Sequence, residues 1–425
     1  MPIQFKHHTL PNRLTVIAEV NPDAHTSAVG FFVKTGARDE TPELMGVSHF
    51  LEHMMFKGTA RRTAEDVNRE FDELGANYNA YTSHEQTVYY ANVLPEFLPR
   101  AVDLLGDMLR PALRGEDFDM EKNVILEEIG MYDDRPEWVL QDRLLETYFC
   151  DASGQDHPLG FRVLGTAETV RSLTAAQMRG YFEGRYSPDN TVVAAAGRLD
   201  FEALVTDLEK LCGDWPITGA SRDTEAPVPT DRQLDLNDAK LSRHYFGMLS
   251  PAPSAQDDDR YAAKVLADVL GDSEGSRLYW AIVDPGLADE ADFSFLPQDG
   301  TGAFLAYTSC DPDRAEQVEA ALLEVLEAVV RDQDINAGEV ERAVNKLATQ
   351  ATLQGERPAG RMQALGTQWT YHGIYTPLEE ELARLTAVSP EQVNRLLDNY
   401  RFTPQTRLRL GPGTRPDADA PEAAK

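Results

Sequence analysis

Alternating apolar and polar residues at the start of the chain predict a pair of strands. The runs LTVIAEV, residues 14–20, and SAVGFFVKTG, residues 27–36, are separated by a turn at NPD, the pattern of half-buried strands joined by a turn. Helical periodicity follows from about Gly46 and again in AEDVNREFDELG, which ends on a glycine as helices commonly do. The segment NYNAYTSHEQTVYYANVL is rich in Tyr, Thr and Val and predicts two further strands. Helical patterns then dominate, including the stretch from Phe118 to Asp133, until the strand TVVAAAG closes the first half at about Gly197.

The same order of elements begins again after a proline-rich segment. DWPITGASRDTEAPVPTDR carries three prolines and no hydrophobic periodicity, which predicts a linker at 216–232. Beyond it, RHYFGMLS resembles SAVGFFVKTG, VLADVLGDSEGS takes the place of the helix at Gly46, and GAFLAYTS precedes the helical DRAEQVEAALLEVLEAVVR. We therefore expect an α+β fold with two related domains, 1–215 and 233–412, each a mostly antiparallel sheet packed with helices. The polar residues 413–425 predict a disordered tail.

The net charge of the chain disfavours some classes of binding partner. Hydrophobic residues make up 42% of the 425 residues, which is normal for globular domains. Against 40 Lys and Arg stand 71 Asp and Glu, so the net charge is −31. Such a surface repels phosphate backbones and anionic membranes, and we expect neither nucleic acid nor a membrane as partner. The excess charge is compatible with basic peptides, and it also serves solubility.

The three cysteines and the N-terminal residues give information about the cellular compartment of the protein. Cys150, Cys212 and Cys310 are an odd, widely spaced set without CxxC, so they predict neither a disulfide framework nor a zinc ribbon. Each is expected to be a small apolar residue of the interior. The start of the sequence has neither the apolar run of a signal peptide nor the Arg- and Ser-rich character of a transit peptide. We therefore expect a cytoplasmic protein.

The string HFLEH, residues 49–53, is the strongest candidate for chemistry. On a helix, His49 and His53 lie one turn apart on one face, so two imidazoles can converge on one metal ion. Glu52 shares that face and is placed to accept a proton from a metal-activated water. Phe50 and Leu51 point elsewhere and would anchor the helix in the core. Taken alone, HxxEH is a weak pattern, because paired histidines on a helix are also found as ordinary surface or core residues.

A third metal ligand is suggested by the helical stretch EKNVILEEIGMYDD. Glu121 and Glu128 are two helical turns apart and differ by only about 20° around the axis, whereas Glu127 points about 100° away from Glu128. Apolar residues lie between the two acids on that face, which is unusual for a solvated surface. The pattern is explained if one carboxylate binds a metal and the other orients a histidine ring. For Glu128 alone, an ordinary solvated helix acid would be the simpler interpretation.

Taken in order, these motifs resemble the pitrilysin, insulinase and mitochondrial-processing-peptidase family of zinc peptidases. HFLEH is followed by FKGT, NAYTSHEQTVYY and EKNVILEEI, then by HPLG at 157–160 and YSPDNTVVAAAG at 186–197. The resemblance covers essentially the whole first half of the chain, and the inverted order HxxEH is specific to it.

The resemblance implies a site for one zinc ion per chain. In the family, the two histidines of HxxEH and a glutamate about 75 residues later bind zinc, and Glu128 follows His53 by 75 residues. The ligands would thus be His49, His53 and Glu128, and Glu121 would orient a histidine from behind. The glutamate between the histidines, here Glu52, is the general base of the family.

A substrate-binding strand is also implied. In the family, the strand that contains Asn79, Ala80 and Tyr81 lies at a sheet edge and pairs with the backbone of the peptide substrate, which gives affinity through main-chain hydrogen bonds. The tyrosines in this region, taken by themselves, would be expected to serve strand packing.

The second half departs from the family where the substrate is contacted. It has no metal pair, and although SRL at 276–278 and GLA at 286–288 are kept, Val283 and Asp289 stand where the family has an arginine and a tyrosine. One explanation is that a homologous partner subunit supplies that pair, as in family members that divide the functions between two chains. The other is that peptidase activity has been lost while zinc is kept.

The sequence as a whole predicts a zinc metalloendopeptidase that acts on extended peptides. We expect it to be the zinc-bearing subunit of a heterodimer, with a homodimer as the second possibility. Two alternatives differ in class: a structural relative without catalysis, like the core subunits of a respiratory complex, and a zinc-binding scaffold that activates a partner. Retention of HxxEH argues against the first of these alternatives.

Overall fold

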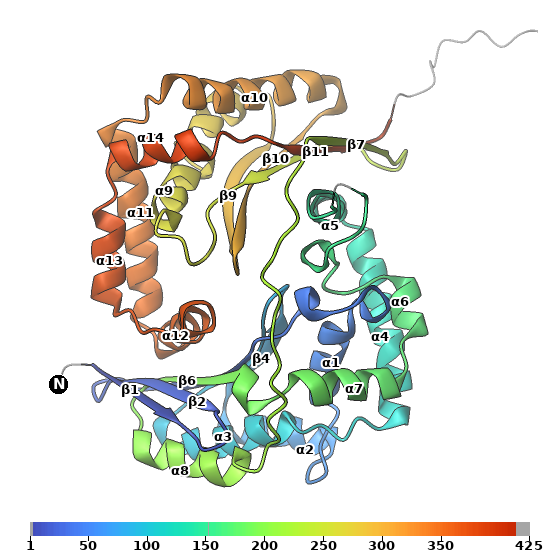
Figure 1. The fold of residues 1–425 in the computed structure, drawn as a ribbon, viewed down its shortest axis with the longest axis vertical. Helices are drawn as coiled ribbons and strands as arrows, with labels where there is room; N and C mark the ends of the chain where they lie inside the picture. Colours follow the sequence, from blue (N-terminus) through green and yellow to red (C-terminus); the bar gives the residue numbers. More distant parts are fainter. Residues whose placement is uncertain (1–2, 152, 414–425) are drawn as a thin grey trace, which may run out of the picture. The chain divides into compact units, whose positions relative to one another are not determined.

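The structure of the chain is a computed structural model that describes residues 3–151 and 153–413 (Figure 1). It contains two compact units with one sheet each. The first combines Met1–Met131, His157–Thr224 and Ala348–Ala383, and the second combines Tyr132–Asp156, Glu225–Leu347 and Arg384–Lys425. Each unit therefore contains segments from both halves of the sequence.

The domain boundaries expected at 1–215, 216–232 and 233–412 follow chain order and stay a prediction. The tail predicted at 413–425 lies, from residue 414 onward, outside the described residues. Within the described part of the chain, no helix is both long enough and apolar enough to cross a bilayer. The three cysteines are free thiols, of which Cys212 and Cys310 are buried and Cys150 is partly exposed.

The sheet of the first unit has six strands in the order β1-β2-β6-β3-β5-β4. Its strands are β1 (Gln4–Thr9), β2 (Thr15–Val20), β3 (Ser27–Val33), β4 (Asn77–Thr82), β5 (Thr87–Val93) and β6 (Thr191–Gly197). All neighbours are antiparallel except β2 and β6. The helices are α1 (Val47–Met55), α2 (Ala64–Leu74), α3 (Leu98–Met108), α6 (Ala167–Ser172), α7 (Ala175–Arg185), α8 (Phe201–Cys212) and α12 (Pro358–His372).

Both faces of the first sheet are covered. On one face, Val29, Phe31 and Val33 of β3 join a large core with residues of α1, α3 and α8. On the other face, Phe32 packs with Met362 and Leu365 of α12. Burial on both sides explains why SAVGFFV is apolar almost throughout instead of alternating.

Helix α12 lies very close to this sheet (Figure 1). A Cβ atom at Gly366 would come within 2.2 Å of the Phe32 ring, so only glycine permits this approach. Arg361 on α12 donates two hydrogen bonds, of 2.8 and 2.5 Å, to the carboxylate of Glu19 on β2, and both side chains are buried. A helix from late in the sequence is thereby fixed to the N-terminal sheet by a bidentate ion pair.

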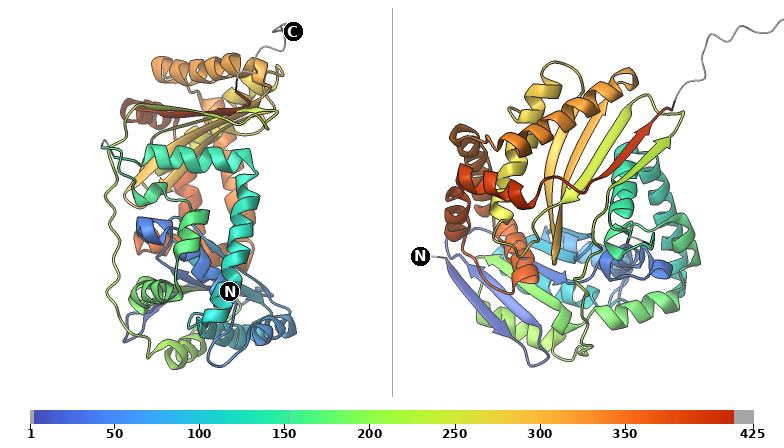
Figure 2. Two further views of the ribbon diagram at one scale, coloured as in Figure 1. Left: turned by 90° about the vertical axis from the view of Figure 1, so that its right-hand side faces the viewer. Right: turned by 45° about the horizontal axis from the view of Figure 1, so that its top comes forward.

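The second unit repeats this plan with five strands in the order β7-β11-β8-β10-β9. The strands are β7 (Arg232–Asn237), β8 (His244–Pro251), β9 (Glu290–Gln298), β10 (Thr301–Cys310) and β11 (Thr406–Gly411), and only β7 and β11 run parallel. Its helices are α5 (Pro136–Tyr148), α9 (Arg260–Gly271), α10 (Ala315–Asp332) and α14 (Pro390–Asn399). Helix α10 crosses one face of this sheet (Figure 2), and α5 contacts β8 and β11.

Three helices continue from one unit into the other: α4 (Gly115–Asp133), α11 (Ala337–Gly355) and α13 (Leu378–Thr386). The predicted α+β fold, with two mostly antiparallel sheets packed with helices, is confirmed. Strand β1 was not expected, because QFKHHT lies at a sheet edge and is exposed at nearly every position, so it lacks the apolar alternation that identifies a strand.

Candidate metal centre

Helix α1 presents both histidines of HFLEH on one face. Their ring centroids are 4.7 Å apart. Phe50 and Leu51 are fully buried, as their positions in the motif predict, and they fix the rotation of the helix about its axis. The helix begins after Gly46, whose φ of 91° favours glycine and where a Cβ would meet the Leu164 carbonyl oxygen at 2.6 Å.

A buried carboxylate stabilises the start of α1. The N–H groups of Gly46 and Ser48 donate to the Glu40 oxygens at 2.8 and 2.7 Å, so a side chain outside the helix satisfies two of the free amides at its N-terminus. Burial raises the pKa of the Glu40 carboxyl to about 8, although the hydrogen bonds from Ser48 and Gly46 oppose this shift. No local sequence pattern predicts this contact, because Glu40 precedes the cap residue Gly46 by six positions and its partners are backbone atoms.

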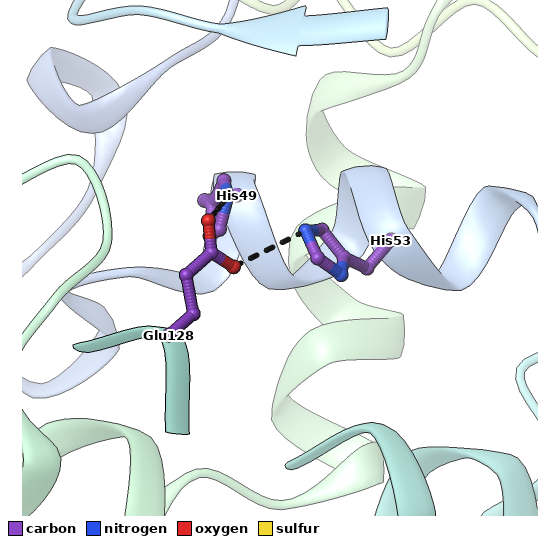
Figure 3. Close-up of side chains that lie close together, drawn as sticks. All are labelled: His49, His53 and Glu128. Atoms are coloured by element: carbon purple, nitrogen blue, oxygen red, sulfur yellow. Dashed lines mark ion pairs between the residues drawn. The ribbon is translucent and has the colours of Figure 1, made fainter. Parts of the chain in front are cut away.

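The Glu128 carboxylate lies between the two imidazoles (Figure 3). Glu128 Oε1 is 3.8 Å from His49 Nε2, and Glu128 Oε2 is 3.6 Å from His53 Nε2. One ligand atom from each of the three residues lies within 4.8 Å of the other two. Residues that are 75 positions apart in sequence thus converge on one point between α1 and α4.

Glu121 and Lys57 form a chain behind His53. Glu121 Oε1 is 2.9 Å from His53 Nδ1, and Glu121 Oε2 is 2.5 Å from Lys57 Nζ. Because a carboxylate only accepts, this contact places a proton on Nδ1 and leaves Nε2 facing Glu128. Glu121 is buried, whereas Glu127 is exposed on another side of the helix, as the helical spacing predicts.

The two histidines differ in their electrostatic surroundings. Burial, assisted by the neighbouring His53, lowers the pKa of His49 to about 3, so this imidazole is neutral at pH 7. Burial also disfavours charge on His53, but the hydrogen bond with Glu121 and the negative charge of Glu128 outweigh it and raise its pKa. The pKa of Glu128 is raised by burial. A cation at this point would favour the neutral imidazoles and the ionised carboxylate, which are the ligating forms.

Glu52 lies beside this group and accepts a hydrogen bond from strand β4. Its side chain is buried, and Thr82 Oγ1 donates a 2.7 Å hydrogen bond to Glu52 Oε2. Burial raises the pKa of Glu52, and the hydrogen bond from Thr82 opposes that shift. Thr82 is a site contact that sequence reasoning missed, since nothing in its local pattern distinguishes it from other strand threonines.

Strand β4, with Asn79, Ala80 and Tyr81, forms the free edge of the first sheet next to β5. The Ala80 N–H donates to the Asn79 side chain at 2.9 Å, so this amide points away from β5 toward the open edge. Tyr81 faces the opposite side of the sheet from α1, and its hydroxyl donates to Gln363 Oε1 on α12 at 3.1 Å. The structure thus places Asn79 and Ala80 at an edge where an extended chain could pair, and Tyr81 in a contact within the unit.

In the second unit, the side chains of Val283 and Asp289 do not provide the hydrogen-bond donors that an arginine and a tyrosine would provide at these positions. Val283 ends a helical turn at Tyr279–Val283 and is half-buried. The exposed Asp289 carboxylate forms an ion pair with Arg243, which also pairs with Asp311.

The donor set of His49, His53 and Glu128 fits a zinc ion. Two imidazole nitrogens and one carboxylate oxygen are the combination that catalytic zinc sites use, with a fourth position left for water. The Glu121 contact to His53 is the kind of outer hydrogen bond that fixes a ligand ring. His49 Nδ1 is buried and has no hydrogen-bond partner among the described residues, so the ring is positioned by packing and by the Glu128 carboxylate, which lies 3.8 Å from Nε2.

Comparisons with known proteins bear on the family and the fold of the chain. Residues 15–160 match the family described as insulinase (peptidase family M16), and residues 172–347 match the peptidase M16 inactive domain. An uncharacterized zinc protease of Mycobacterium tuberculosis is 35% identical over 394 residues, covering 91% of this chain and 88% of the relative. A probable mitochondrial-processing peptidase subunit beta of Arabidopsis thaliana is 31% identical, covering 93% of this chain and 76% of the relative. The crystal structure of a protease from Helicobacter pylori has the same fold, with a TM-score of 0.88 at 19% identity over 97% of this chain and 100% of that one.

Proposed function

The chain belongs to the insulinase family of peptidases, family M16, and we propose that it is the zinc-bearing subunit of an endopeptidase that cleaves extended peptides. Relatives that carry the name zinc protease support a metallopeptidase. The observation that carries the proposal is the convergence of His49, His53 and Glu128 within 4.8 Å, with the Glu52 carboxylate beside them. A cytoplasmic location stays a prediction.

The roles of the side chains follow from their positions. A bound zinc ion would supply Lewis acidity, which polarises a carbonyl and lowers the pKa of a water molecule to about 7. His49, His53 and Glu128 would hold the ion. Glu52 accepts the proton that the attacking water loses and later delivers it to the leaving amine. Its buried position favours this role, because burial raises its pKa toward the operating range of a general base.

Strand β4 is suited to hold the substrate backbone. An extended peptide that pairs with this free edge would exchange main-chain hydrogen bonds with it. The Ala80 N–H, now bonded to the Asn79 side chain, is one such donor. Main-chain hydrogen bonds depend little on the side chains of the substrate. We therefore propose that the peptidase accepts unfolded segments of varied sequence.

The side chains of Val283 and Asp289 lack the hydrogen-bond donors that substrate contact would need, which supports the proposal of a second subunit. Valine has no side-chain donor, and the Asp289 carboxylate can only accept and is paired with Arg243. Neither can stabilise the developing oxyanion or bind the substrate carbonyl, and loss of one such donor typically costs about 10²–10³ in rate. We therefore propose a homologous partner, with an arginine and a tyrosine at these positions, as the source of the missing donors.

The isolated chain is expected to cleave an unstructured peptide only slowly, and addition of the homologous partner is expected to raise the rate by about 10²-fold or more. The measurement is kcat/KM for a quenched-fluorescence peptide with each chain alone and with both together. Cleavage that rises steeply with the concentration of this chain alone would favour a homodimer instead. Full activity at every dilution, unchanged by the partner, would contradict the division of the site.

Glu121→Ala is expected to weaken zinc binding about 10–100-fold without abolishing it, because the mutation removes the carboxylate that orients His53. Zinc affinity is measured by competition with a chelating dye. Glu127→Ala is the matched control, since Glu127 is exposed on the same helix and does not belong to the converging group of ligands. Equal zinc affinity in Glu121→Ala and Glu127→Ala would mean that Glu121 does not support the site.

A further inference from the structure

Thr82 joins two parts of the site that are otherwise separate. It is the last residue of β4, and its hydroxyl donates to Glu52 Oε2 at 2.7 Å. Alternation along β4 places Tyr78, Ala80 and Thr82 on one face, and Tyr78 and Ala80 pack against the core that includes α1. The strand proposed to bind the peptide therefore also contacts the proposed base.

The backbone at Thr82 is held in place by the hairpin that follows. Thr82 is paired with Thr87 on β5 in the antiparallel ladder of the two strands. The turn between the strands is closed by the Ser83 N–H, which donates to the Gln86 carbonyl oxygen at 2.8 Å. A donor on such a closed hairpin has little freedom to move.

The Glu52 side chain depends on that donor for its orientation. A glutamate has three rotatable bonds, and a general base must lie within about 2.6–3.2 Å of the proton that it accepts. Among the described residues, Thr82 is the residue whose side chain donates a hydrogen bond to this carboxylate. The bond occupies Oε2 and leaves Oε1 as the oxygen for proton transfer.

We propose that Thr82 is a positioning residue, which holds the Glu52 carboxylate in the orientation for proton transfer and links the peptide-binding edge of β4 to the base. This inference rests on the proposed function, since it assumes that Glu52 is the base. A peptide that pairs with β4 steadies the strand that carries Thr82. Peptide binding by the β4 backbone and alignment of the base are thereby linked through the Thr82 side chain.

The test compares Thr82→Val, which keeps the shape and removes the hydroxyl, with Thr82→Ser, which keeps the hydroxyl. Thr87→Val is the matched control, because it makes the same change at the paired position of the hairpin, where the hydroxyl donates to the Thr35 carbonyl oxygen at 2.9 Å and not to Glu52. Hydrogen bonds to charged groups are worth enough to change a rate about tenfold or more. We therefore expect kcat to fall about tenfold or more in Thr82→Val, with KM and zinc content unchanged. Thr82→Ser and Thr87→Val should stay within about threefold of the wild type.

A structural readout separates this inference from the proposed function. Crystal structures are expected to show the Glu52 carboxylate in place in Thr82→Ser and displaced or in several conformations in Thr82→Val. An unchanged kcat in Thr82→Val, or a Glu52 carboxylate that keeps its position there, would overturn the role of Thr82. Loss of kcat in Thr87→Val as large as in Thr82→Val would also overturn it, because the effect would then belong to the hairpin as a whole. If the wild type cleaves the peptide and Glu52→Gln does not, the proposed function is supported. That conclusion does not depend on the results for the Thr82 variants.

Discussion

Glu52→Gln is expected to keep its zinc and to lose at least about 10²-fold in kcat. The glutamine amide matches the carboxylate in size but cannot accept a proton at neutral pH, and general-base catalysis typically contributes about 10²–10⁴-fold. Zinc should remain because Glu52 is not one of the three residues whose ligand atoms converge. The measurement is kcat on an unstructured peptide, in the presence of whichever partner gives full activity, together with zinc content.

The control for this variant is Glu127→Gln, the same substitution at an exposed glutamate of α4. It should retain both zinc and activity. Peptide cleavage by Glu52→Gln near the wild-type rate, in a preparation shown to be free of other peptidases, would mean that another group accepts the proton. Loss of zinc in Glu52→Gln would instead mean that Glu52 takes part in holding the metal.

The features that could be predicted from the sequence are those set by local geometry. His49 and His53 converge because residues four apart share a helix face, and the structure brings them to a ring separation of 4.7 Å. Residues seven apart also share a helix face, so the spacing places Glu121 and Glu128 on one face and the exposed Glu127 on another. Both patterns repeat within one element, so no knowledge of the tertiary fold was needed to find them.

The choice between Glu121 and Glu128 needed more than periodicity. Helical spacing put both acids on one face and left open which would face the metal, and only the family spacing favoured Glu128. In the structure, Glu128 lies between the two imidazoles while Glu121 contacts the far nitrogen of His53. That distinction depends on how α4 crosses α1, which no local pattern encodes.

The remaining contacts of the site lie between distant residues and had no sequence signal. Thr82 reaches Glu52 across 30 positions, and Lys57 reaches Glu121 across 64. The placement of α12 on the first sheet, through Arg361 and Glu19, joins residues 342 positions apart. Apolar periodicity shows that a helix has a buried face, but it does not show which sheet that face covers.

The central claim is that His49, His53 and Glu128 hold a zinc ion, and a change at Glu128 tests it most directly. Glu128→Gln replaces a charged ligand with a neutral amide, which binds zinc poorly. The helix should survive, because Glu128 is partly exposed and its polar contacts are with the two histidines. Loss of the ion should remove essentially all zinc-dependent cleavage, an effect as large as that of Glu52→Gln.

The measurement is zinc content by mass spectrometry of the purified wild type, Glu128→Gln and Glu127→Gln, after dialysis against a buffer depleted of metal. Circular dichroism of the three proteins shows whether the helices are retained. We expect about one zinc per chain in the wild type and in Glu127→Gln, and almost none in a folded Glu128→Gln. Undiminished zinc in Glu128→Gln, or a wild type that binds no zinc when the ion is supplied, would contradict it.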